Sequence, residues 1–169
     1  MKKVVLTGPE STGKSTLALA LSKHFGCPFV PEVARAYLEE QEGFYEEPDL
    51  VKIAKRQFET ETEVAKFASE LLICDTDLLT IQIWGEVVYE RSDPWIKAKN
   101  LENQPDLYLL CAADLPWEAD PLRENPDDRE ALFSLYQQAL EAQKTPYTLI
   151  QGLEENRLQL AIQAIDKLL

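Results

Sequence analysis

The sequence predicts an α/β fold, a three-layer sandwich built on a five-stranded parallel sheet. Five short runs are apolar throughout, as strands buried on both faces are, and segments long enough for crossover helices separate them. These runs are residues 3–7, 28–31, 71–75, 107–111 and 147–151. The first run leads directly into a glycine-bracketed segment, which is the second observation that favours this class.

The segments that come after the first, fourth and fifth runs have the spacing of apolar residues expected for helices. Apolar residues at positions i, i+3, i+4 and i+7 predict a helix that buries one face. The expected faces are Leu17, Ala20, Leu21 and His24, then Leu132, Leu135, Tyr136 and Ala139, and finally Leu158, Ala161, Ile162 and Ile165. Segment 48–70 is long and polar with a thinner apolar stripe of Leu50, Ile53, Ala54 and Phe58. We therefore expect one or two helices over an edge of the sheet, as a candidate substrate cover.

The length of 169 residues suits one hydrophobic core, so we expect a single domain over residues 1–169. Segments 39–48 and 115–126 combine charges with glycine or proline, which predicts loops. We expect the second loop, extended to about residue 129, to form a lid.

Charge and cysteine content narrow the possible partners. The 30 acidic and 17 basic residues give a net charge of −13, which disfavours nucleic acid and anionic membranes as partners. No apolar run approaches the ~18 residues of a membrane span. Cys27, Cys74 and Cys111 lack zinc-site spacing and are odd in number, so we expect buried, reduced thiols in a cytoplasmic protein. The oligomeric state is left open.

The segment after the first run has the pattern of a phosphate-binding loop, Gly8-Pro9-Glu10-Ser11-Thr12-Gly13-Lys14-Ser15. Backbone amides around Gly8 and Gly13 can surround a phosphate, and the helix that follows adds its positive dipole end. Lys14 supplies a charge for the β- and γ-phosphates of ATP, and the Ser15 hydroxyl suits Mg²⁺. The expected nucleotide-binding residues are Gly8, Glu10, Ser11, Thr12, Gly13, Lys14, Ser15 and Thr16.

Carboxylates follow two other runs, at the edge where parallel sheets place ligands. Asp75 ends the run 71–75 and is the expected partner of Mg²⁺, with Asp77 close behind it. Glu32 follows the run 28–31. Glu32, Asp75 and Asp77 are all candidates for the base that accepts a proton from a substrate hydroxyl. The alternatives are a strand end with incidental acids and, for Glu32, a helix cap.

Arginines after the fourth run are candidates for stabilising a transferring phosphoryl group. Arg123 and Arg129 lie in or beside the expected lid, which would close over the nucleotide. The alternative is a surface loop in which the arginines pair with neighbouring acids. The Asn-Lys-x-Asp and Leu-Ser-Gly-Gly strings of other P-loop classes are absent, and the chain is short for an AAA+ module with a helical lid domain. A small-molecule kinase remains.

Four segments resemble the ribosylnicotinamide kinase domain of the bacterial NadR proteins and their free-standing relatives. They are residues 8–16, residues 32–37, Asp75-Thr76-Asp77 with Thr80, and Pro116-Trp117 with Asp120 and Arg123. The resemblance implies transfer of the γ-phosphate of ATP to the 5′-hydroxyl of nicotinamide riboside, giving nicotinamide mononucleotide for NAD synthesis.

The resemblance also implies roles for single residues. Glu32, Arg35 and Asp77 would face the nucleoside, and Trp117, Asp120, Arg123 and Arg129 would form the lid, with Trp117 and Asp120 near the substrate.

Two positions depart from the NadR pattern. Pro121 stands where glycine is usual, and Pro31 stands where the two-activity proteins have an aromatic residue. The first strand begins near Lys3, so no adenylyltransferase or DNA-binding segment is expected in this chain. The alternatives are a kinase for another nucleoside or nucleotide, and a nucleotide-dependent binding protein without a small-molecule acceptor.

Overall fold

The computed structural model describes residues 1–122 and 128–169 and shows one five-stranded sheet of parallel strands. The strand order is β2-β3-β1-β4-β5. The bounds are β1 (Lys2–Thr7), β2 (Phe29–Val30), β3 (Leu71–Asp75), β4 (Leu107–Cys111) and β5 (Tyr147–Ile150). The predicted sheet is therefore confirmed, with each run displaced by one residue at most at either end.

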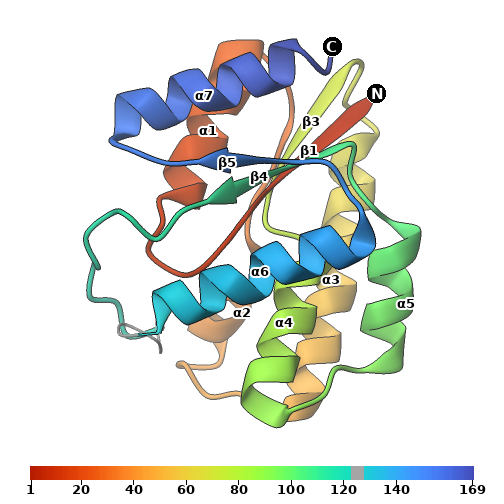
Figure 1. Ribbon diagram of the computed structural model, residues 1–169. Helices are drawn as coiled ribbons and strands as arrows, with labels where there is room; N and C mark the ends of the chain where they lie inside the picture. Colours follow the sequence, from red (N-terminus) through yellow and green to blue (C-terminus); the bar gives the residue numbers. More distant parts are fainter. Residues whose placement is uncertain (123–127) are drawn as a thin grey trace.

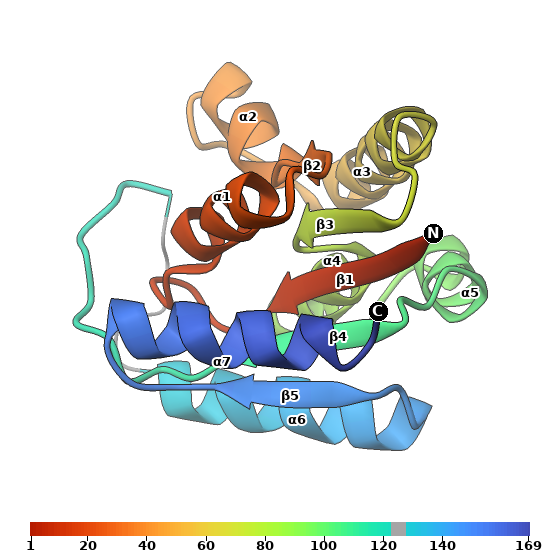
Figure 2. The ribbon, with the colours of Figure 1, turned by 90° about the horizontal axis from the view of Figure 1, so that it is seen from above.

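Helices cover both faces of this sheet and make the molecule three-layered (Figure 1). They are α1 (Lys14–Phe25), α2 (Val33–Glu40), α3 (Glu47–Ala65), α4 (Leu78–Tyr89), α5 (Pro94–Glu102), α6 (Arg129–Gln143) and α7 (Glu154–Asp166). Figure 2 shows α1 and α7 on one face and α4 and α6 on the other. Helices α3 and α5 pack against α4 in a cluster of their own.

The central strand β1 explains why the runs are apolar throughout. Val4 and Leu6 pack into the core beneath α1 and α7, whereas Val5 packs into the core beneath α4 and α6. A strand covered on both faces has no polar side to alternate with. In this register Leu6 pairs with Asp75, so the end of β3 lies beside the start of the phosphate loop.

Two predicted helix faces are rotated in the structure. On α1 the buried residues are Leu17, Ala18 and Leu21, while His24 is exposed. On α6 the buried residues are Tyr136 and Leu140, and Leu135 is 41% exposed. Both helices carry more apolar residues than one face holds, so their spacing predicts a helix without fixing its rotation.

The long polar segment forms one helix, α3, which borders the β2 edge of the sheet. Its buried residues include Leu50, Ile53 and Ala54, as expected, but Gln57 takes the inner position in place of Phe58. None of the described helices combines the length and the apolar character that a bilayer span needs.

Candidate active site

The phosphate loop is shaped by the close approach of β4. Gly8 has φ 133°, and a Cβ built there would lie 2.6 Å from the carbonyl oxygen of Cys111. Any side chain at this position would collide with backbone, so only glycine fits. Gly13 precedes α1 with φ 75°, which turns the chain into the helix. These two glycines fix the loop that the sequence predicts.

The loop folds around its own lysine. Lys14 Nζ lies 3.0 Å from the Gly8 oxygen and 2.6 Å from the Pro9 oxygen, and Thr12 Oγ1 donates to the Pro9 oxygen at 2.8 Å. The ammonium group is therefore held over the loop's concave side, where the phosphates of a nucleotide would lie.

Ser15 and Asp75 meet at the end of β3. Ser15 Oγ donates to Asp75 Oδ2 at 2.5 Å, while Asp75 Oδ1 is buried without a partner among the described residues. Burial raises the pKa of Asp75, which the Ser15 hydrogen bond and the Lys14 charge partly offset. A hydroxyl beside a carboxylate with a spare buried oxygen is an arrangement that Mg²⁺ would complete.

The rest of a magnesium shell would have to come from elsewhere. The described residues contain no group of three or more His, Cys, Asp or Glu side chains that could hold a metal alone. Mg²⁺ in kinases is held by one or two protein groups together with phosphate oxygens and water, which suits this pair.

Glu32 lies at the start of α2 but does not cap it, because its side chain makes no capping hydrogen bond. It lines the same cavity as the phosphate loop. Burial raises the pKa of Glu32, repulsion from Asp75 raises it further, and the Lys14 charge opposes both effects. A carboxylate with a raised pKa suits general-base catalysis near neutral pH.

A cavity of about 700 Å³ joins the phosphate loop to two other regions. One region is formed by the start of α7 with Glu154, Glu155 and Leu158, and the other by α2, α3 and α4 with Glu32, Arg35, Gln57, Ile81 and Trp84. Sequence reasoning missed Gln57 and Trp84, because their spacing along α3 and α4 marks them only as helix residues. The cavity is of a size that holds small ligands.

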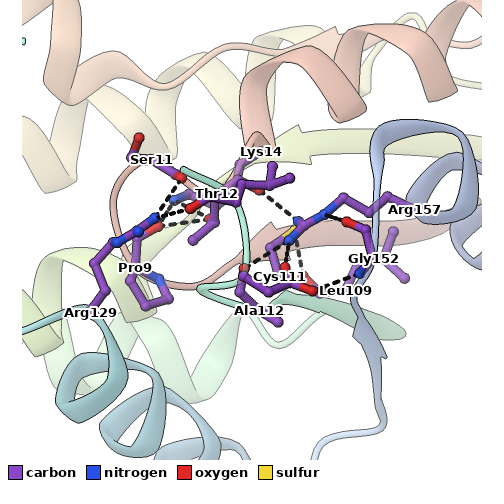
Figure 3. A network of polar contacts seen from close by, with 12 residues as sticks. Pro9, Ser11, Thr12, Lys14, Leu109, Cys111, Ala112, Arg129, Gly152 and Arg157 are labelled. Atoms are coloured by element: carbon purple, nitrogen blue, oxygen red, sulfur yellow. Dashed lines mark hydrogen bonds and ion pairs between the residues drawn. The ribbon is translucent and has the colours of Figure 1, made fainter. Parts of the chain in front are cut away.

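Arg129 and Arg157 donate hydrogen bonds to the phosphate loop from opposite sides (Figure 3). Arg129, the first residue of α6, donates to the Ser11 oxygen at 3.2 Å and to the Leu115 oxygen at 2.7 Å. Arg157 of α7 donates to the Thr12 oxygen at 2.8 Å and also to the oxygens of Ala112 and Gly152. Sequence reasoning missed Arg157, since no motif surrounds it.

The loop after β4 forms part of the cavity wall. Glu118 N donates to Ser11 Oγ at 2.9 Å, and the Arg129 guanidinium lies 5.6 Å from the centre of the Trp117 ring. Asp120 forms an ion pair with Arg35 at 3.0 Å, which ties this loop to α2.

Of the predicted lid residues, Arg123 falls outside the described residues. Arg129 contacts Trp117 and backbone oxygens, whereas the alternative was that it pairs with acids of the loop. Trp117 and Asp120, which were expected near the substrate, are not among the residues that line the cavity.

Asp77 is placed differently from the expectation that it faces a nucleoside. It is 2% exposed and does not line the cavity. One oxygen accepts from Leu79 N at 3.1 Å as the cap of α4, and the other accepts from the Tyr108 hydroxyl at 2.6 Å. The structure thus places this carboxylate in the core, where it caps α4 and binds Tyr108, and not in the lining of the cavity.

The cysteines are free thiols, but Cys27 is half-buried, whereas Cys74 and Cys111 are buried as expected. Cys27 directly follows Gly26, the exposed residue that ends α1.

Comparisons with known proteins identify the family and the fold. A family model described as "AAA domain" matches residues 3–157. The trifunctional NAD biosynthesis/regulator proteins NadR of Salmonella typhimurium and Escherichia coli are each 29% identical over 165 residues. These matches take in 94% of this chain but 37% of each relative, so the chain spans little more than a third of their length.

Solved structures share the fold at lower identity. A NadR protein in complex with NR has a TM-score of 0.82 at 18% identity, covering 98% of this chain and 51% of the other. A NadR protein in complex with NAD and AMP-PNP has a TM-score of 0.84 at 19% identity, covering 98% and 49%. Deoxyadenosine kinase from M. mycoides with bound dATP has a TM-score of 0.66 at 19% identity, covering 98% and 100%.

The family match takes in β1 to the start of α7, which is the sandwich together with its phosphate loop. Among the described residues, α7 alone follows β5, so the match does not depend on the separate helical lid domain of AAA+ modules. The resemblance to NadR that the motifs indicated is confirmed by the curated relatives. The chain belongs to the P-loop family described as "AAA domain", with the fold of a P-loop phosphotransferase.

Proposed function

We propose that this protein is an ATP-dependent kinase that transfers the γ-phosphate of ATP to the 5′-hydroxyl of nicotinamide riboside. The observation that carries the proposal is the placement of Glu32. Glu32 lines the cavity that Lys14 and Ser15 also line, and Ser15 in turn is hydrogen-bonded to Asp75. A hydroxyl beside Glu32 would therefore share one space with the phosphate loop.

The residues of this chain divide the chemistry between them. Lys14 and the loop amides would bind the β- and γ-phosphates and neutralise charge as the phosphoryl group moves. Ser15 and Asp75 would hold Mg²⁺, which would supply positive charge to neutralise the phosphates. Glu32 would orient the 5′-hydroxyl and accept its proton. Arg129 and Trp117 would keep the loop after β4 over the phosphates, which excludes water.

The region of the cavity formed by α2, α3 and α4 supports a flat, positively charged ring as the substrate's base. Trp84 lines the cavity, and its Nε1 donates to the Tyr45 hydroxyl at 3.0 Å, which fixes the indole plane. An indole face attracts cations, and nicotinamide riboside carries a pyridinium charge. Pro31 stands where the two-activity NadR proteins have an aromatic residue before α2. Trp84 of α4 could serve as the aromatic partner of the ring instead. A NadR protein has been solved in complex with NR, an abbreviation of this nucleoside, in the same fold.

A second candidate is a kinase for another nucleoside, because deoxyadenosine kinase shares the fold. A nucleotide-dependent binding protein without a small acceptor is the third. A site whose acidic Glu32 shares a cavity with the phosphate loop favours a kinase over a protein that only binds nucleotide, since binding alone needs no carboxylate there.

The test is a product assay with purified protein, ATP, Mg²⁺ and a panel of nicotinamide riboside, adenosine, deoxyadenosine and cytidine. We expect nicotinamide mononucleotide as the main product, identified by chromatography and mass. Turnover of another nucleoside in its place would reject the substrate but keep the kinase. Tight ATP binding with no phosphorylated product from any nucleoside would reject the kinase itself.

A further inference from the structure

Gln57 of α3 is a polar side chain in an apolar position. It is 2% exposed, and it lies on the buried face of the helix with Leu50, Ile53 and Ala54. It also lines the cavity on the side of Glu32 and Trp84. A core position on this helix face would ordinarily hold an apolar residue, so the amide calls for an explanation.

The orientation of the amide is fixed by its neighbour. Gln57 Oε1 accepts a hydrogen bond from Val33 N at 3.0 Å. A backbone N–H can only donate, so the oxygen of the amide must face Val33 and the nitrogen must point elsewhere. Val33 follows Glu32 directly, so this contact also places Gln57 against the turn that presents the carboxylate.

The amide nitrogen is left without a partner. Gln57 Nε2 is buried and makes no hydrogen bond to any described residue. A buried donor without an acceptor costs free energy, and native proteins keep few of them. A donor retained at this cost in the lining of a ligand cavity is explained if a ligand completes it.

We propose that Gln57 determines substrate specificity by donating a hydrogen bond from Nε2 to an acceptor atom on the substrate's base. For nicotinamide riboside that acceptor is the carboxamide oxygen. The inference rests on the proposed function. It adds that the protein recognises the substituent on the ring. Gln57 would both bind the base through Nε2 and hold the turn at Glu32 in place through its hydrogen bond with Val33 N.

The proposal predicts how a missing carboxamide is tolerated. Ribosylpyridinium has the same sugar, ring and charge as nicotinamide riboside but lacks the carboxamide. A site with an unpaired donor rejects an analogue that lacks the matching group. We expect the wild-type protein to prefer nicotinamide riboside by about 10- to 100-fold in kcat/KM.

The variant Gln57→Met removes the donor at nearly constant volume and should reduce that preference to about 3-fold or less. Losing the hydrogen bond with Val33 N would lower kcat for both nucleosides alike, so their ratio separates binding of the base from a structural role. Gln57→Glu keeps an oxygen for Val33 and serves as the second variant if Gln57→Met does not fold. Gln163→Met, at an exposed position on α7, is the matched control and should keep the wild-type ratio.

Three results would overturn the inference. The first is equal use of the two nucleosides by the wild-type protein. The second is an unchanged preference in the folded Gln57 variants while nicotinamide riboside is still phosphorylated, which would leave the proposed function standing. The third is a wild-type protein that phosphorylates other nucleosides but not this one, which would reject the proposed substrate and this inference together.

Discussion

Ser15 Oγ donates to Asp75 Oδ2 at 2.5 Å, so the first turn of α1 is joined to the end of β3. The neighbouring oxygen of Asp75 is buried and unpartnered among the described residues. The pair therefore combines one structural contact with one oxygen free for another ligand. This separation allows the two roles of Asp75 to be tested independently.

Asp75→Asn should lower kcat by about 100-fold or more while the protein stays folded. The amide oxygen of asparagine can still accept from Ser15, but it offers Mg²⁺ no negative charge. We expect the Mg²⁺ concentration for half-maximal activity to rise as well. Steady-state kinetics across a Mg²⁺ series measures both effects, with Asp166→Asn on the exposed side of α7 as control. Wild-type kcat in Asp75→Asn would show that this residue is not in the metal site.

Lys14→Ala should remove nearly all turnover and weaken ATP binding. The ammonium group contacts the oxygens of Gly8 and Pro9, and no other lysine lines the cavity that the structure describes. Without that charge the transferring phosphoryl group loses about 2.7–4 kcal/mol of stabilisation, which is 100- to 1000-fold in rate. The control is Lys23→Ala, at an exposed position of the same helix. Activity within 10-fold of wild type in Lys14→Ala would contradict the assigned role.

Protonation of Glu32 should cause the fall of kcat/KM on the acid side of the pH profile. Burial and the Asp75 charge raise the pKa of Glu32, so its carboxylate becomes protonated at a higher pH than an ordinary glutamate does. Because only the ionised form can accept a proton, kcat/KM should fall as the pH drops through that raised pKa. Glu32→Gln should lose this fall and lower kcat by about 100-fold or more. A fall that persists in Glu32→Gln would assign it to another group.

Asp77 should affect stability and leave catalysis nearly unchanged. Burial raises the pKa of Asp77 from 3.8 to about 6, so the folded protein binds this proton more tightly than the unfolded chain does. The contribution to stability is therefore full below about pH 4 and is lost as the pH rises to about 6. At 1.36 kcal/mol per pKa unit, the loss amounts to about 2–3 kcal/mol.

The measurement is urea unfolding of wild type and Asp77→Asn between pH 4 and pH 7. The free energy of unfolding of the wild type, relative to the variant, should fall as the pH rises over this window. The variant keeps a side-chain oxygen for the cap of α4, so kcat should stay within about 3-fold of wild type. A large loss of kcat in the folded variant would restore Asp77 to the substrate site.

The sheet and the phosphate loop could be predicted from sequence because their signals are local. Strands buried on both faces are continuously apolar, and Gly8 and Gly13 answer backbone constraints within a few residues. Helix α4 gives a weak signal for the opposite reason. It packs against the sheet on one side and against α3 and α5 on others, so its apolar residues surround it and little periodicity is left.

The part of the cavity formed by α2, α3 and α4 could not be predicted, because its residues come from helices that meet only in the folded protein. Gln57 and Trp84 lie 27 positions apart by their numbers, and each looks like an ordinary helix residue until Val33 N and the Tyr45 hydroxyl are found beside them. Asp77 shows the converse error. Its place after a strand suggested a ligand, but the choice between cavity and core depends on the Tyr108 hydroxyl, which β4 supplies.

Arg157 should set the position of the phosphate loop and therefore the affinity for ATP. It is 3% exposed and donates to the oxygens of Thr12, Ala112 and Gly152, besides forming an ion pair with Asp114. Arg157→Met would leave these acceptors unpaired and cost about 3–5 kcal/mol of stability. Arg157→Lys keeps the charge but cannot reach several oxygens at once with a planar fork.

We expect Arg157→Lys to fold, to raise KM for ATP by about 10-fold and to leave kcat within a few-fold of wild type, because the residue positions the loop without contacting the transferred group. KM for the nucleoside should stay unchanged, since Glu32 and Gln57 lie on the α2–α3 side of the cavity. The matched control is Lys144→Arg, at the exposed residue that ends α6 and does not line the cavity. A fall in kcat with unchanged KM would mean that Arg157 acts on the transition state, and the guanidinium would then have to be counted among the groups that meet the phosphates.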